Sequence, residues 1–136
     1  MRQIKAYAPR RRDAASMSDR PRVTIVEDDV SLLSAMTFAL EEEGFAVSPY
    51  DRGQELLNGP PDTDCLVVDL KLRDADGLAL IADLRRLGVS PPAILITTNP
   101  DGQCRRRAAA AGVEIVEKPL LGADLGRRIE QLIAGR

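Results

Sequence analysis

The sequence of 136 residues contains no histidine and no tryptophan. Without histidine, the chain cannot use an imidazole as a general acid, as a general base or as a metal ligand. It also cannot carry a phosphohistidine of its own. Only four side chains are aromatic, namely Tyr7, Phe38, Phe45 and Tyr50. Stacking on nucleic-acid bases is therefore not expected.

Cysteine and long apolar runs are also scarce. Cys65 and Cys104 are too few for a disulfide scaffold or a zinc site. No apolar run approaches the roughly 18 to 20 residues of a membrane span, and the N-terminus lacks the apolar core of a signal peptide. We therefore expect a cytoplasmic protein with no membrane partner. With 44% hydrophobic residues, the chain can form one domain with a real core.

The net charge of −2 is unevenly distributed along the chain. Residues 1–20 carry six basic and two acidic side chains, and the remaining residues carry 13 basic and 19 acidic ones. We interpret residues 1–21 as a disordered basic leader, or as sequence upstream of a start at Met17. A basic tail could instead touch nucleic acid or a membrane surface. The acidic body argues against DNA binding by the domain itself, because phosphate contacts dominate that affinity.

From Arg22 onward, short apolar runs alternate with helical patterns. Strands are predicted at 22–26, 45–48, 65–69, 93–97 and 113–116, and helices at 30–43, about 54–57, 77–87, 105–111 and 124–134. In two of the predicted helices, Phe38 and Leu87 are among the apolar residues that recur at helical spacing. The run 65–68 is wholly apolar, as is typical of a strand buried on both faces. The alternation predicts an α/β domain over 22–136, with a doubly wound, five-stranded parallel sheet.

Polar side chains stand at the ends of four of these strands. They are Glu27, Asp28, Asp69, Thr97 and Lys118. In a parallel sheet the carboxyl ends of the strands share one edge, where ligands bind. A single acid there is usually a solvated residue or a helix N-cap, as Asp28 or Asp29 could be. The convergence of five groups is harder to attribute to capping: clustered carboxylates favour a divalent cation, and a lysine favours an anion.

Four motifs at these positions resemble the receiver domain of bacterial two-component response regulators. They are Val26-Glu27-Asp28-Asp29, Val67-Val68-Asp69-Leu70-Lys71-Leu72 with Asp76-Gly77, Ile96-Thr97, and Val116-Glu117-Lys118-Pro119. Each is weak alone, but the four in this order are specific. The resemblance covers residues 22–136 and implies a flavodoxin-like (βα)5 fold. It leaves no room for an output domain, which implies a stand-alone receiver without a DNA-binding domain.

The resemblance implies a chemistry for the strand-end residues. Asp69 would be the phosphoacceptor, attacking a phosphohistidine on a sensor histidine kinase or a phosphotransfer protein. The implied ligands of a Mg²⁺ ion are Glu27, directly or through water, Asp28, Asp69 and the main-chain carbonyl of Lys71. Lys118 and Thr97 would each bind a phosphoryl oxygen, and Pro119 would follow a cis peptide bond. The chain would catalyse only its own phosphorylation and dephosphorylation, and would signal to a downstream partner or output protein, with a homodimer as an option.

The sequence departs from the family pattern at several positions. Arg73 replaces the usual proline of the loop after the third strand, which implies a less rigid loop, and Leu121 replaces a polar residue before the last helix. Thr97 and Ile115 occupy the switch positions, but Ile115 has no aromatic ring. We therefore expect the signal to leave through the loop 98–101 and the helix after it, whose start should be weak because Gly102 lies at its entry. The residues expected to tune access and phosphoryl lifetime are Lys71, Thr98 and Asn99.

Three alternatives compete with this interpretation. A pseudo-receiver, used as a phosphorylation-independent binding module, keeps the fold without the chemistry. A nucleotide-binding enzyme is disfavoured because no Gly-rich phosphate loop follows the first strand. A Mg²⁺-dependent phosphatase built on a strand-end aspartate would need a second carboxylate at position 71, where the chain has lysine. The run 105–107 of three arginines is either a docking patch or a solvated helix face.

Overall fold

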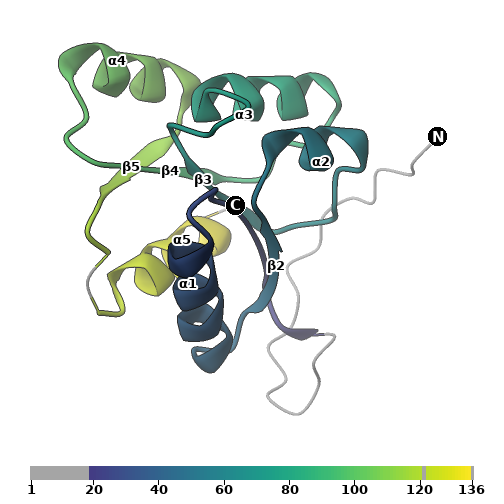
Figure 1. The fold of residues 1–136 in the computed structure, drawn as a ribbon. Helices are drawn as coiled ribbons and strands as arrows, with labels where there is room; N and C mark the ends of the chain where they lie inside the picture. The colour runs from purple at the N-terminus through teal and green to yellow at the C-terminus, as the bar shows by residue number, and fades with distance from the viewer. Residues whose placement is uncertain (1–18, 121, 136) are drawn as a thin grey trace.

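The computed structural model describes residues 19–120 and 122–135 (Figure 1). Most of the expected basic leader, at 1–18, and Leu121 lie outside the described residues, so the expectations about them stay predictions. Among the described residues, no helix has the length and hydrophobicity needed to cross a lipid bilayer.

The described residues form alternating strands and helices in the predicted order. The strands are β1 (Arg22–Val26), β2 (Ala46–Tyr50), β3 (Cys65–Asp69), β4 (Ala93–Thr97) and β5 (Glu114–Glu117). The helices are α1 (Val30–Glu42), α2 (Gly53–Asn58), α3 (Gly77–Arg86), α4 (Gly102–Ala111) and α5 (Asp124–Ala134). The strands pair in parallel in the order β2-β1-β3-β4-β5. The predicted doubly wound parallel sheet is confirmed.

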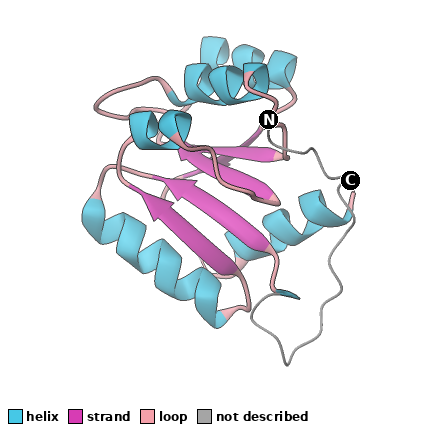
Figure 2. Ribbon diagram, turned by 90° about the vertical axis from the view of Figure 1, so that its right-hand side faces the viewer, coloured by secondary structure: helices cyan, strands magenta, loops and turns pink. Residues whose placement is uncertain are grey.

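Helices cover both faces of the sheet (Figure 2), and each face carries an apolar layer. On one face, α1 and α5 pack on alternate strand residues, including Ile25, Val67 and Ile94. On the other face, α2, α3 and α4 pack on the intervening residues, including Val68 and Leu95. Because successive strand residues point to opposite faces, one strand serves both layers. This packing makes β3 buried along its whole length, so its last residue, an aspartate, is held on a rigid support.

Several predicted boundaries and faces differ from the structure. α4 begins three residues earlier than predicted, because the Asp101 side chain accepts a hydrogen bond from Cys104 N at 2.7 Å and caps the helix. Phe38 is 67% exposed and Leu87 58% exposed, so neither joins the core. Phe38 lies two positions from both Met36 and Leu40, which at 100° per residue puts it on the opposite side of α1. Leu87 follows the last residue of α3.

Candidate functional site

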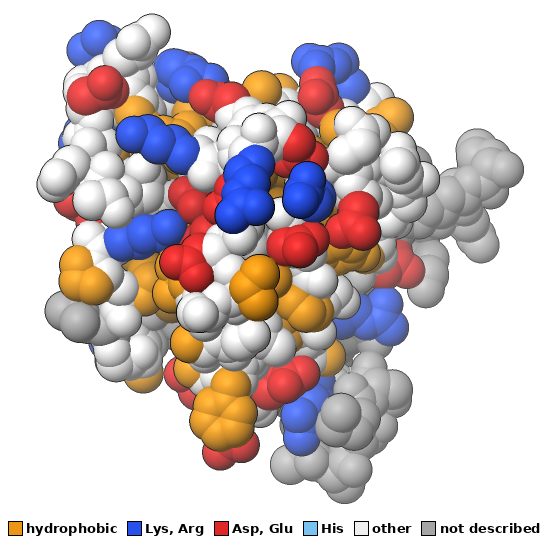
Figure 3. Space-filling model, viewed as in Figure 1, with side chains coloured by type: hydrophobic (Ala, Val, Ile, Leu, Met, Phe, Trp, Pro, Cys, Tyr) orange, Lys and Arg blue, Asp and Glu red, His pale blue; other side chains and the backbone are white. Residues whose placement is uncertain are grey.

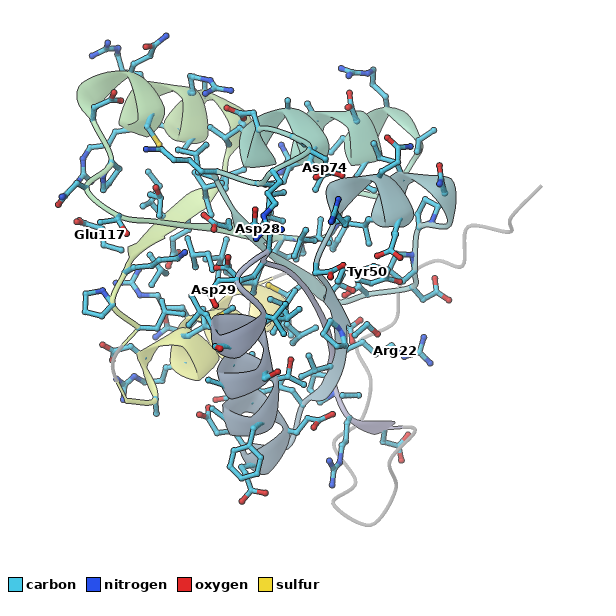
Figure 4. All side chains as sticks on the ribbon, viewed as in Figure 1. Arg22, Asp28, Asp29, Tyr50, Asp74 and Glu117 are labelled. Carbon is cyan, nitrogen blue, oxygen red and sulfur yellow. The ribbon has the colours of Figure 1, made fainter. Side chains whose placement is uncertain are left out.

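Three carboxylates meet where β1 and β3 end. One oxygen from each of Glu27, Asp28 and Asp69 lies within 4.8 Å of the other two. The parallel pairing of Val26 with Val68 puts the ends of these neighbouring strands side by side. Figure 4 shows Asp28 in the centre of the view, between the start of α1 and the helices above it. The structure therefore brings together the acids whose convergence the strand ends predicted.

Lys118 stands against two of these acids. Its Nζ donates a hydrogen bond to Asp69 Oδ2 at 3.1 Å and lies 2.9 Å from Glu27 Oε1. Burial by itself would lower the pKa of Lys118, but the contacts with Glu27 and Asp69 outweigh it and raise this pKa. Lys118 N also donates to Thr97 O at 2.8 Å, and the Lys118–Pro119 peptide is cis, as the resemblance implied.

Glu27 is the most buried acid of the cluster, with 1% of its surface exposed. Burial raises the pKa of Glu27 above its ordinary value, and the Asp69 carboxylate adds to the rise, while Lys118 and the Asp29 N–H oppose it. The Asp29 N–H donates to Oε2 at 3.1 Å. Oε1 is buried, and among the described residues it pairs with the Lys118 ammonium at 2.9 Å. Oε1 therefore already lies against a positive charge, and a buried carboxylate oxygen in such a place is suited to a cation.

Arg73 holds Asp28 in place, a role that was not predicted from the sequence. The main-chain N–H of Arg73 donates to Asp28 Oδ2 at 2.8 Å, and Arg73 Nε lies 3.8 Å from the same oxygen. A proline at position 73 has no N–H and could not make this hydrogen bond. The departure from the family pattern at this position was the available signal. The following acid, Asp29, caps α1 by accepting from Leu32 N at 3.1 Å.

Two aspartates, Asp74 and Asp76, anchor the loop at 70–76 that joins β3 to α3. Asp74 accepts hydrogen bonds from Gly53 N at 3.2 Å and Gln54 N at 3.0 Å, and so caps α2 from another part of the chain. Asp76 caps α3 through Ala79 N and accepts two hydrogen bonds from the Arg107 guanidinium. These contacts hold the loop in place without the proline that the family usually has there.

The other predicted site residues surround this cluster. Thr97 is buried at the end of β4, whereas Thr98 and Asn99 are exposed and Asn99 has a positive φ of 47°. Lys71 is exposed, and its main-chain N–H donates to Asp69 Oδ1 at 3.2 Å. Ile115 is half-buried and packs against the core layer beneath α3 and α4.

The oxygens at the strand ends fit a hard divalent cation. Mg²⁺ prefers a small number of carboxylates and keeps several positions for water and substrate oxygens. The cluster offers three carboxylates whose oxygens lie within 4.8 Å of one another. Figure 3 shows acidic and basic side chains gathered in the middle of the molecular surface that faces the viewer. The arrangement can hold a cation and, through Lys118, an anionic group next to it.

Comparisons with known proteins agree with this geometry. A family model described as the response regulator receiver domain matches residues 23–130. Nodulation protein W of Bradyrhizobium diazoefficiens is 32% identical over 111 residues, which cover 79% of this chain and 49% of that protein. Transcriptional regulatory protein FixJ of Rhizobium meliloti is 34% identical over 112 residues, which cover 80% of this chain and 55% of FixJ. The chain thus spans about half the length of these curated relatives.

A solved structure is similar over nearly the whole of its own chain. It is the signal receiver domain of a modulated diguanylate cyclase from Desulfovibrio desulfuricans G20. The match has a TM-score of 0.77 and 33% sequence identity, and it covers 86% of this chain and 96% of that one.

Proposed function

The chain belongs to the response regulator receiver domain family, and we propose that it is a phosphoacceptor whose Asp69 receives a phosphoryl group from a histidine kinase or a phosphotransfer protein. One observation carries this proposal: Asp69, at the end of a fully buried strand, stands in contact with a lysine and beside two further acids. That set supplies a nucleophile, a cation site and an anion-binding charge within one small region.

Asp69 would act as the nucleophile. One carboxylate oxygen forms a bond to phosphorus, the bond from phosphorus to the donor's imidazole nitrogen breaks, and that nitrogen keeps the electron pair. Residues 1–136 contain no histidine, so a phosphohistidine donor must lie outside them. Asp69 is 6% exposed, and its contact with the Lys71 N–H orients Oδ1.

The neighbouring groups would stabilise charge on the phosphoryl oxygens. A Mg²⁺ ion held by Glu27, Asp28 and Asp69 would neutralise part of that charge. Lys118 already lies within hydrogen-bond distance of Asp69 Oδ2. A small displacement of its side chain would therefore let the ammonium donate to a phosphoryl oxygen on Asp69 instead. Thr97 would donate its hydroxyl to another oxygen. The main-chain carbonyl of Lys71 remains our proposed additional ligand.

We further propose that the phosphorylated domain signals by protein contacts in the cytoplasm and that it hydrolyses its own aspartyl phosphate. Lys71 is the residue that would regulate this hydrolysis, because its exposed side chain follows Asp69 by two positions and can cover the phosphoryl group. Thr98 and Asn99, exposed beyond the end of β4, would limit the approach of water from that side.

The test is incubation with acetyl phosphate and Mg²⁺, followed by intact-mass measurement. We expect the parent protein to gain one phosphoryl group and Asp69→Asn to gain none. Asp64→Asn is the matched control, because Asp64 is an equally buried aspartate at the opposite end of β3, where it accepts from Arg22 N at 2.8 Å. A parent protein that gains no mass with either donor class, acetyl phosphate or a phosphorylated kinase, would favour the pseudo-receiver alternative.

A further inference from the structure

Arg73 contacts Asp28 through two different groups. Its main-chain N–H donates to Asp28 Oδ2 at 2.8 Å, and its guanidinium Nε lies 3.8 Å from the same oxygen. The two contacts have different characters. The N–H is part of the backbone and is retained by any residue except proline, whereas the Arg73 side chain is 71% exposed, so its charge is screened by water and salt.

The position of the Arg73 N–H is set by the rest of its loop. Asp74 is fixed by its two hydrogen bonds to the first turn of α2, and Leu72 N donates to Ala75 O at 3.1 Å. The donor at residue 73 is therefore held on both sides. Because a carboxylate is planar, a fixed Oδ2 also sets the direction in which Oδ1 of Asp28 points. Asp28 is the least buried of the three clustered acids and needs such support most.

We propose that Arg73 is a positioning residue for Asp28 and that its side-chain charge weakens the binding of divalent cations at the three-acid cluster. The inference rests on the proposed function, because it assumes that this cluster binds Mg²⁺. The main chain of Arg73 orients one cation ligand, and the guanidinium competes with the cation for the same carboxylate. Arg73 thus tunes how much Mg²⁺ the domain needs.

The test measures cation binding without a phosphodonor. Mn²⁺ bound to the full chain is followed by electron paramagnetic resonance, and Mg²⁺ is added as a competitor. Arg73→Ala keeps the N–H and removes the charge, Arg73→Lys keeps both, and Arg73→Pro removes both. Arg86→Ala is the control, because it removes the same charge at the far end of α3, roughly 13 Å along the helix from Gly77.

We expect Arg73→Ala to bind Mn²⁺ more tightly than the parent by a factor of about two to five at low salt, with the difference lost at high salt. Arg73→Lys and Arg86→Ala should bind as the parent does. Arg73→Pro should bind more weakly than Arg73→Ala, since both lack the charge and only the proline lacks the donor. Equal affinities for Arg73→Ala and the parent at low salt would overturn the charge effect, and equal affinities for Arg73→Pro and Arg73→Ala would overturn the positioning role.

A second measurement covers the case in which Arg73→Pro does not fold. The amide proton of Arg73 should exchange slowly in the parent and faster in Asp28→Ala, and an unchanged exchange rate would also overturn the positioning role. A parent protein that bound neither Mn²⁺ nor Mg²⁺ would instead contradict the metal site of the proposed function. The two failures are therefore distinguishable.

Discussion

Gly77 packs directly against the main chain of Asp69. A Cβ atom at position 77 would lie 2.2 Å from Asp69 O and 3.0 Å from Leu70 Cα. Gly77 N also donates to Leu70 O at 2.7 Å, which ties the start of α3 to the end of β3. The glycine of the Asp76-Gly77 motif is therefore required by the close approach of two backbones at the site.

We expect Gly77→Ala to lower the free energy of unfolding by about 1–3 kcal/mol, because the obstructing atoms belong to the backbone and cannot rotate away. It should also displace Asp69 and slow phosphorylation. Gly126→Ala is the control. Its Cβ would meet Glu43 Oε1, the end of an exposed and flexible side chain, so helix propensity should dominate and stabilise the protein by up to about 1 kcal/mol. Urea unfolding measures both, and a Gly77→Ala protein as stable as the parent would contradict the packing argument.

The raised pKa of Glu27 makes stability depend on pH. Burial is the main cause of the rise above the ordinary value of 4.5. A carboxyl with a higher pKa in the folded state binds protons more tightly there, so its contribution to stability is complete below 4.5 and is lost as pH rises through the folded pKa. We expect Glu27→Gln to remove this loss, and Mg²⁺ to reduce it by favouring the ionised form. Thermal unfolding between pH 4.5 and 8 in the absence of metal gives the profile; identical profiles for Glu27→Gln and the parent would disprove the assignment.

Asp76 links α3 to α4 through Arg107. Burial by itself would raise the pKa of Asp76, but the Arg107 guanidinium and the Ala79 N–H lower it overall. Because this ion pair is exposed, we expect Arg107→Ala to cost no more than about 1 kcal/mol. Asp76→Ala should cost more, about 1–2 kcal/mol, because it also removes the N-cap of α3. Arg106→Ala, at a position for which the described residues provide no ion pair, is the control and should be neutral. Equal losses for Asp76→Ala and Arg107→Ala would show that the cap contributes nothing.

Activation should move the backbone before α4 rather than the side chain of Ile115. Ile115 is half-buried against the layer under α4, and its β-branched side chain is stiff at χ1. We expect the amides at 98–106 to shift most in NMR spectra when Mg²⁺ and beryllofluoride, a phosphoryl mimic, are added, while the Ile115 methyl groups keep one rotamer. The Asp101 cap on Cys104 N is the hydrogen bond to follow, because it closes the first turn of α4. A rotamer change at Ile115 with unshifted amides at 98–106 would reverse this expectation.

The sequence by itself determined the elements whose signals are local. β3 and α5 have the predicted bounds. The continuous apolar run of β3 and the regular apolar stripe of α5 are signals contained within a few consecutive residues. The meeting of Glu27, Asp28 and Asp69 also followed from the sequence, because parallel strands bring their carboxyl ends to one edge. The rotation of 100° per residue along α1 would also have placed Phe38 on the solvent side of this helix.

Only the tertiary structure decided which groups support the site. Asp74 caps a helix that begins 21 residues earlier in the chain, and Arg73 donates to an acid 45 residues earlier. No local pattern encodes such contacts, because they depend on where two loops lie after the sheet has assembled. The strand ends predicted that Lys118 lies at the same edge as the acids, but only the tertiary structure decided that its Nζ contacts Glu27 Oε1 and Asp69 Oδ2. The strand order β2-β1-β3-β4-β5 brings these distant segments together, and burial of the sheet on both faces keeps them there.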